Sequence, residues 1–65
     1  NYDIILLTLL SEGILQKNIP QILQQRNINP NSLSSVEKRI STMKIAMDVK
    51  NNEQLIGSCK DLGII

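Results

Sequence analysis

The side chains best able to make polar contacts with a ligand lie near the middle of the chain, in the stretch NSLSSVEKRI at 31–40. Three serines precede the charged triplet Glu37-Lys38-Arg39, while the surrounding sequence is mostly leucine, isoleucine and amide residues. Hydroxyl, ammonium and guanidinium groups donate hydrogen bonds to phosphate oxygens and to acceptors on base edges. The stretch therefore indicates either a capped helix start with a solvated face or a surface that meets a polyanion.

Apolar spacing predicts that this stretch opens an amphipathic helix. The residues expected on its buried face are spaced by 4, 3 and 4 positions: Val36, Ile40, Met43 and Met47. A rotation of about 100° per residue gathers another set on the opposite face: Ser34, Lys38, Ser41 and Ile45, flanked by Ser35, Glu37 and Thr42. Serines before a helix are also ordinary N-caps. Ile45 is apolar yet outward, so we expect it to pack on the C-terminal tail or on a partner.

The rest of the composition argues against an enzyme. The chain has no histidine and one cysteine, Cys59, so neither an internal disulfide nor a cysteine-histidine zinc cluster can form. We find no glycine-rich loop and no carboxylate pair at a cleft-forming spacing, and we predict no cofactor and no metal site. Cys59 is expected to be buried, and its isolation fits a cytoplasmic protein. With one aromatic residue, Tyr2, the chain lacks a base-stacking platform.

Charge is distributed unevenly along the chain. The net charge is only +1, but residues 17–50 hold six basic and two acidic residues, and most acidic residues lie nearer the ends of the chain. A basic middle is a mild indication of a nucleic-acid face. The longest apolar run, residues 4–10, is far shorter than the roughly 20 residues of a membrane span, so no membrane association is predicted.

Four helices account for most of the 65 residues, and no strand pattern is present, so the predicted fold class is all-α. The first helix should bury Ile5, Leu6, Leu9 and Leu10 and stop at Gly13. The second spans about 16–26, with Pro20 in its first turn and Ile19, Ile22 and Leu23 buried. Residues 27–31 form a turn before the third helix. The fourth spans about 52–62 and ends at Gly63. It is capped by Asn51 with Gln54 as in a capping box, with Leu55, Ile56, Cys59 and Leu62 inward.

Two helices separated by a polar turn, the second with hydroxyls and a base outward, describe a helix-turn-helix. The segment VEKRISTMKIAMDVKNNEQLIGSCKDLGII resembles the C-terminal half of the LuxR/FixJ-type (NarL-like) DNA-binding domain of bacterial transcription regulators. LLTLLSEG and GILQKNI are similar to the VLxLLAxG and GxSNKEI segments of its first half. The resemblance covers nearly the whole chain and implies a single four-helix domain, 1–65, from the C-terminus of a longer regulator. A receiver domain phosphorylated on aspartate and a small-ligand-binding domain are both compatible upstream, and the receiver domain is our expectation.

The resemblance also implies roles for individual residues. It assigns Lys17, Ser35, Lys38, Arg39, Lys50 and Asn51 to the contact of a sequence-specific domain that places its third helix in the major groove of double-stranded DNA. The outward face of that helix adds Ser34, Glu37 and Ser41 as groove contacts, and Lys44 adds electrostatic attraction. The last helix corresponds to the family's dimer contact, here Gln54, Ile56, Gly57 and Lys60, so a homodimer on DNA or a heterodimer with another regulator is implied.

Three departures from the family pattern alter these expectations. The connection between Ile19 and Val36 is about six residues longer than in the family. Glu37 stands where the family usually has a basic residue, and Pro20 replaces a small alanine. Glu37 repels phosphate but can accept a hydrogen bond from cytosine. A second hypothesis therefore stays open, in which the same helical fold pairs with another regulator and DNA binding has disappeared or is auxiliary.

Overall fold

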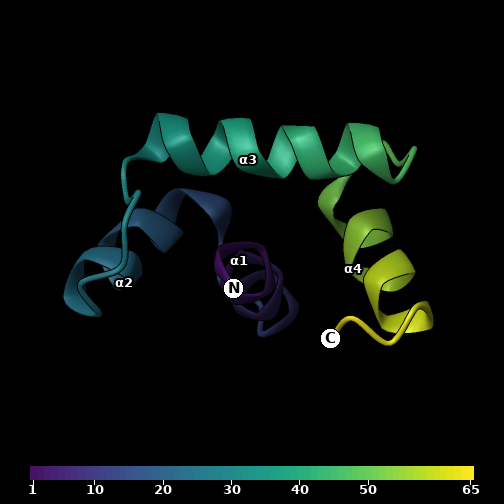
Figure 1. Cartoon of the computed structure of the whole chain (residues 1–65), viewed down its shortest axis with the longest axis horizontal. Helices are drawn as coiled ribbons and strands as arrows, with labels where there is room; N and C mark the ends of the chain where they lie inside the picture. The colour runs from purple at the N-terminus through teal and green to yellow at the C-terminus, as the bar shows by residue number, and fades with distance from the viewer.

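The computed structural model describes residues 1–65 and contains helices and connections only. The elements are α1 (Tyr2–Ser11), a short 3-10 helix η1 (Gln16–Asn18), α2 (Ile19–Gln25), α3 (Leu33–Ala46) and α4 (Asn52–Asp61). In Figure 1, α3 runs along one side of the molecule, α1 is seen end-on below it, and α2 and α4 lie below its two ends. The prediction of an all-α, four-helix chain is confirmed. The predicted second helix differs in one respect, because its first turn is the separate 3-10 helix.

Side-chain caps explain where three of the helices begin. The Asn1 side chain accepts a hydrogen bond from the Asp3 amide at 2.8 Å, and Ser32 accepts from the Ser35 amide at 3.2 Å. Asn51 accepts from the Gln54 amide at 2.8 Å, as the sequence predicted. The Gln54 side chain, however, accepts from the Lys50 amide, one residue earlier than in a standard capping box. These bonds satisfy amide donors that the helices themselves leave free.

All four helices end in the same way. Each is followed by a residue with positive φ: Gly13, Asn27, Asp48 and Gly63. The next residue is apolar and donates its amide to the carbonyl five positions back, as Ile14 does to Leu9 at 3.1 Å. This is the Schellman arrangement, in which a left-handed residue lets the chain turn back over the last helical turn. The predicted stops at Gly13 and Gly63 are therefore confirmed.

Nine buried residues form the core: Leu6, Leu7, Leu9, Ile19, Leu23, Val36, Ile40, Leu55 and Cys59. The stripe predicted for α1 was partly wrong, because Leu7 is buried while Ile5 and Leu10 are only half-buried. α1 is packed by both α3 and α4, so its buried face is wider than a single stripe. Ile22, Ile56 and the two methionines predicted for the buried face of α3, Met43 and Met47, are likewise half-buried rather than buried.

Leu62 was predicted to point inward, and this is wrong. Its side chain is 65% exposed. α4 ends at Asp61, and the chain reverses at Gly63, so Leu62 lies past the last core residue of α4, Cys59. No helix has both the length and the apolar character that a membrane span requires.

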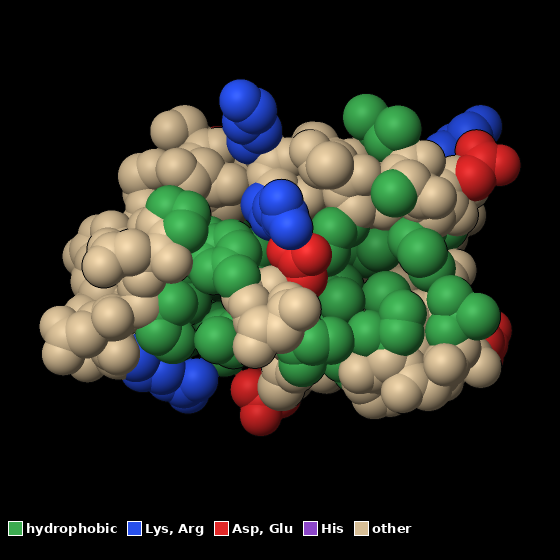
Figure 2. Space-filling view, in the orientation of Figure 1, with side chains coloured by type: hydrophobic (Ala, Val, Ile, Leu, Met, Phe, Trp, Pro, Cys, Tyr) green, Lys and Arg blue, Asp and Glu red, His purple; other side chains and the backbone are tan.

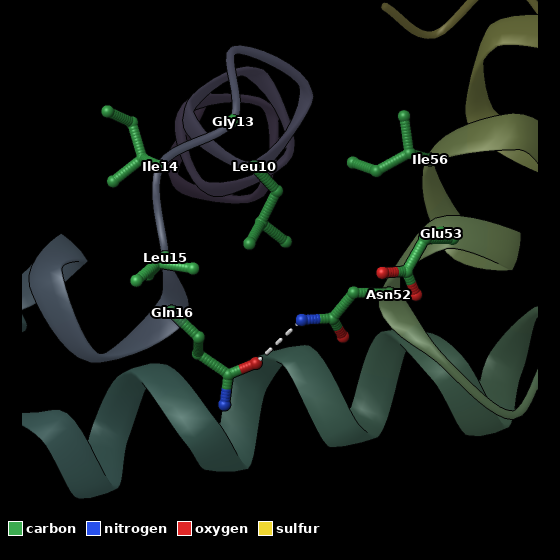
Figure 3. Close-up of a pocket in the computed structure, with 8 residues that line it drawn as sticks. All are labelled: Leu10, Gly13, Ile14, Leu15, Gln16, Asn52, Glu53 and Ile56. Carbon is green, nitrogen blue, oxygen red and sulfur yellow. Dashed lines mark hydrogen bonds between the residues drawn. The ribbon is translucent and has the colours of Figure 1, made fainter.

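Polar contacts between distant segments hold the helices in place around the core. The Tyr2 hydroxyl donates to the Pro30 carbonyl at 2.8 Å, which ties the start of α1 to the α2–α3 connection. The side-chain Nδ2 of Asn52 donates to Oε1 of Gln16 at 2.9 Å across the hollow drawn in Figure 3, and this bond joins η1 to the start of α4. Both contacts fix the surroundings of α3, which packs against every other helix.

Candidate nucleic-acid interface

The outward side of α3 carries the line of residues that the sequence predicted. We call Ser34, Lys38, Ser41 and Ile45 the α3 ridge; all four are exposed. Val36 and Ile40 on the opposite side are fully buried. No other element of the chain covers the ridge in Figure 1, and Figure 2 shows cationic side chains standing along this edge. The ridge is therefore open to a ligand along the whole length of α3.

Ile45 differs from its expected environment. Its side chain is 80% exposed, so it does not pack on the C-terminal tail. The tail turns back over α4 instead, because the Ile64 amide donates to the Cys59 carbonyl. Ile45 therefore remains available to a partner, which is the other expectation drawn from the sequence.

Two predicted contact residues beside the ridge already have partners within the chain. Arg39 donates from Nη2 to Oδ2 of Asp3 at 2.9 Å and from Nε to Oδ1 of the same carboxylate. This hydrogen-bonded pair lowers the pKa of Asp3 below its ordinary value, with a smaller contribution from the Arg39 charge. The Ser35 hydroxyl accepts a bond from Ser32 at 2.8 Å. Both residues stay accessible, because Arg39 is exposed and Ser35 is half-buried.

Glu37 and Lys44 lie on one flank of α3. Glu37 is exposed and Lys44 is half-buried. Asp48, just beyond the helix end, is also exposed. By helical position Glu37 and Lys44 share a side, about 80–100° round from Val36. This flank of α3 thus carries one basic and one acidic residue.

The remaining predicted DNA-binding residues lie outside α3. Lys17 is exposed on η1, which packs against α3. Lys50 is exposed in the α3–α4 connection, beyond the C-terminal end of α3. The side-chain oxygen of Asn51 caps α4, so the Nδ2 group of that side chain is the part left to donate to a DNA phosphate. Exposed lysines therefore precede and follow α3 in the sequence.

The opposite flank of α3 borders a groove that the sequence did not predict. We call it the flank groove; its lining residues are Tyr2, Asn29, Pro30, Ser35, Lys38, Arg39 and Thr42. Only one of the seven is hydrophobic. Tyr2 and the neighbouring Asp3 reach it from α1, and no periodicity in the sequence signals contacts between residues 28 and 36 positions apart.

The predicted dimer residues of α4 do not all face the same way. Gln54, Gly57 and Lys60 are exposed. Ile56 is half-buried and points into the hollow between α1, η1 and α4, opposite Leu10 and Ile14 (Figure 3). An outward α4 contact would therefore rest on the three polar and small residues.

A second apolar region lies between the start of α1, the end of α3 and α4, where Figure 2 shows green side chains gathered below α3. Its lining includes Ile4, Met43, Met47 and Ile64. Cys59 is buried at its base, and burial raises the pKa of the thiol. No group of three or more cysteine, aspartate and glutamate side chains comes together as a metal site.

Comparison of the chain with protein-family models, with curated proteins and with solved structures gives no match.

Proposed function

We propose that the chain binds double-stranded DNA sequence-specifically through α3, as the output domain of a LuxR/FixJ-type transcription regulator acting in the bacterial cytoplasm. The observation that carries the proposal is the open α3 ridge. Its first three members, Ser34, Lys38 and Ser41, combine two hydroxyls with an ammonium group on one exposed line. Hydroxyls donate and accept, and lysine donates to the O6 and N7 acceptors of guanine, so this line suits the edges that bases present in the major groove.

The length of the ridge sets the size of the site that one copy could read. Ser34 and Ser41 are seven residues apart, which is about 10 Å along a helix. Successive base pairs are about 3.4 Å apart, so the polar part of the ridge spans about three base pairs. A site of that size occurs by chance throughout a genome. Specific binding therefore calls for two copies on two half-sites, and the exposed α4 residues Gln54, Gly57 and Lys60 are our candidates for the contact between them.

Electrostatic attraction to DNA would come from the basic residues around α3 rather than from the whole chain, whose net charge is +1. Lys17 and Lys50 are exposed and lie before and after the helix in the sequence. Each lysine that neutralises a phosphate releases counterions, so binding should weaken linearly on a log–log plot against salt. Exposed Glu37 opposes this attraction and favours a cytosine near the start of α3.

The test replaces the only cation on the ridge. We expect Lys38→Ala to weaken binding to a duplex selected from a random pool by about tenfold or more, the range expected when one base contact is removed. Fluorescence anisotropy at fixed salt measures the affinity. Arg26→Ala is the matched control: it also removes one positive charge from an exposed position, but at the end of α2, away from the ridge. Equal affinities for the wild type and Lys38→Ala would remove the assignment of α3 as the reading helix.

The second candidate function is a protein-interaction module that pairs with another regulator. It is favoured by one observation, the 80% exposure of Ile45 beside polar ridge residues. Large exposed apolar side chains are common at protein interfaces. A salt titration on a random duplex separates the two candidates, because a module that only binds protein should show almost no salt-dependent DNA binding.

A further inference from the structure

The flank groove beside α3 is polar, and most of its hydroxyl hydrogens can be traced. Tyr2 donates its hydroxyl hydrogen to Pro30, and Thr42 donates its own to the Lys38 carbonyl at 2.9 Å. Neither hydroxyl can therefore donate to a ligand without breaking a bond within the chain. Ser35 differs, because its hydroxyl accepts from Ser32 and keeps its own hydrogen.

Three donors in the groove remain free. They are the Ser35 hydroxyl, the Lys38 ammonium and the Nη1 group of Arg39. Asp3 binds the Nε and Nη2 side of the guanidinium, so it fixes the orientation of the group while leaving the Nη1 edge unpaired. Because the Lys38 ammonium is also the cation of the ridge, the guanidinium edge and the Ser35 hydroxyl are the two donors left for a single oxyanion, whose oxygens accept several short hydrogen bonds at once.

The two flanks of α3 differ in charge. The flank groove carries Lys38 and Arg39, and the one acid at its edge, Asp3, is already paired. The other flank has Lys44 on the same side of the helix as Glu37, so its two charges are opposite. A helix in the major groove has a phosphate strand on each side. The strand that passes the flank groove would meet the stronger positive field.

We propose that the flank groove seats one backbone phosphate of duplex DNA, held by the Ser35 hydroxyl and Nη1 of Arg39, while the Lys38 ammonium stays with the ridge. The inference rests on the proposed function and adds to it the position of the DNA strand relative to α3. Asp3 is a positioning residue for Arg39. The phosphate contact would fix the register of the helix, while the ridge reads the bases.

The experiment measures fluorescence anisotropy of a random-sequence 20-base-pair duplex with the full chain over a range of salt concentrations. Two variants remove seat donors, Ser35→Ala and the double variant Asp3→Asn/Arg39→Gln, which leaves the net charge of the chain unchanged. We expect each to weaken binding by about tenfold at low salt, the usual loss for a hydrogen bond to a charged group. The double variant should also lower the log–log salt slope by about 0.9, the value for one phosphate contact.

Matched controls separate a direct role in binding from an effect on folding. Ser35→Thr keeps a hydroxyl and should restore binding, and Ser11→Ala removes a hydroxyl on α1 that bonds only the Thr8 carbonyl and should bind like wild type. Thermal melts show whether each variant is folded. If the wild-type chain shows no salt-dependent binding, the proposed function itself fails. If the wild type binds, and both seat variants bind with the wild-type affinity and slope, the phosphate seat is overturned while the proposed function stands.

Discussion

Two isoleucines on α3 offer a direct measurement of which face of the helix is open. Ile40 is fully buried and Ile45 is 80% exposed, although both are the same residue type on one helix. Ile40→Ala should cost about 2–4 kcal/mol of unfolding free energy, because three buried carbon atoms are removed and a cavity is left. A chain of this length is stable by about 3–10 kcal/mol in all, so the loss would be large. Ile45→Ala should change stability by less than about 0.5 kcal/mol, since the better helix propensity of alanine offsets the small apolar area that the isoleucine buries.

Urea denaturation followed by far-ultraviolet circular dichroism gives both values, and two protein concentrations detect self-association. A loss above about 1 kcal/mol for Ile45→Ala would mean that another surface covers this residue in solution. The ridge would then be closed, and the reasoning that leads from α3 to DNA would be wrong. A loss below about 0.5 kcal/mol for Ile40→Ala would contradict the assignment of the buried face itself.

Two further predictions concern the contacts that position α3 and α4. Arg39 donates to the Asp3 carboxylate and so lowers the pKa of Asp3 below 3.8 in the folded chain. The unfolded chain therefore binds this proton more readily than the folded chain. The stabilisation from the Asp3–Arg39 pair is complete above the unfolded pKa and is lost as pH falls through the folded pKa. Urea titrations from pH 2 to 6 should therefore show wild type and Asp3→Asn converging at the acid end, and a constant difference would contradict the ion pair. Asn51→Ala should lower the unfolding free energy by about 1 kcal/mol through loss of the α4 cap. Asn51→Ser should keep most of it, and a loss as large as that of alanine would show that capping is not the cause.

The helix boundaries could be predicted because their causes are local. Asn51 and the serines cap the helix that follows them, and Gly13 and Gly63 adopt the left-handed conformation that ends a helix. Each of these signals acts within about five residues, so it can be read without knowing the fold. The apolar spacing of α3 was also sufficient, since one face of that helix meets the core and the other meets water.

The burial of α1 and the end of α4 could not be predicted in the same way. Leu7 is buried because two helices pack on α1, and Leu62 is exposed because the core ends before it. Both outcomes depend on where other helices lie. The Arg39–Asp3 pair joins residues 36 apart, so nothing near Arg39 in the sequence indicates that its guanidinium is already engaged.

The α3 ridge is open because the other elements pack on one side of α3 only. α3 has 14 residues, about 21 Å of helix, and the other elements pack on its core-facing side. The 65 residues build one core, and none of their other elements covers the outward side of α3. Reading bases requires more than exposure, because contact groups must be held within about 0.5 Å of their working positions. The bond from Tyr2 to the connection before α3 and the bonds between Asp3 and Arg39 in the middle of α3 would supply that constraint for the proposed DNA contact. Their value to DNA reading would then exceed their small contribution to stability.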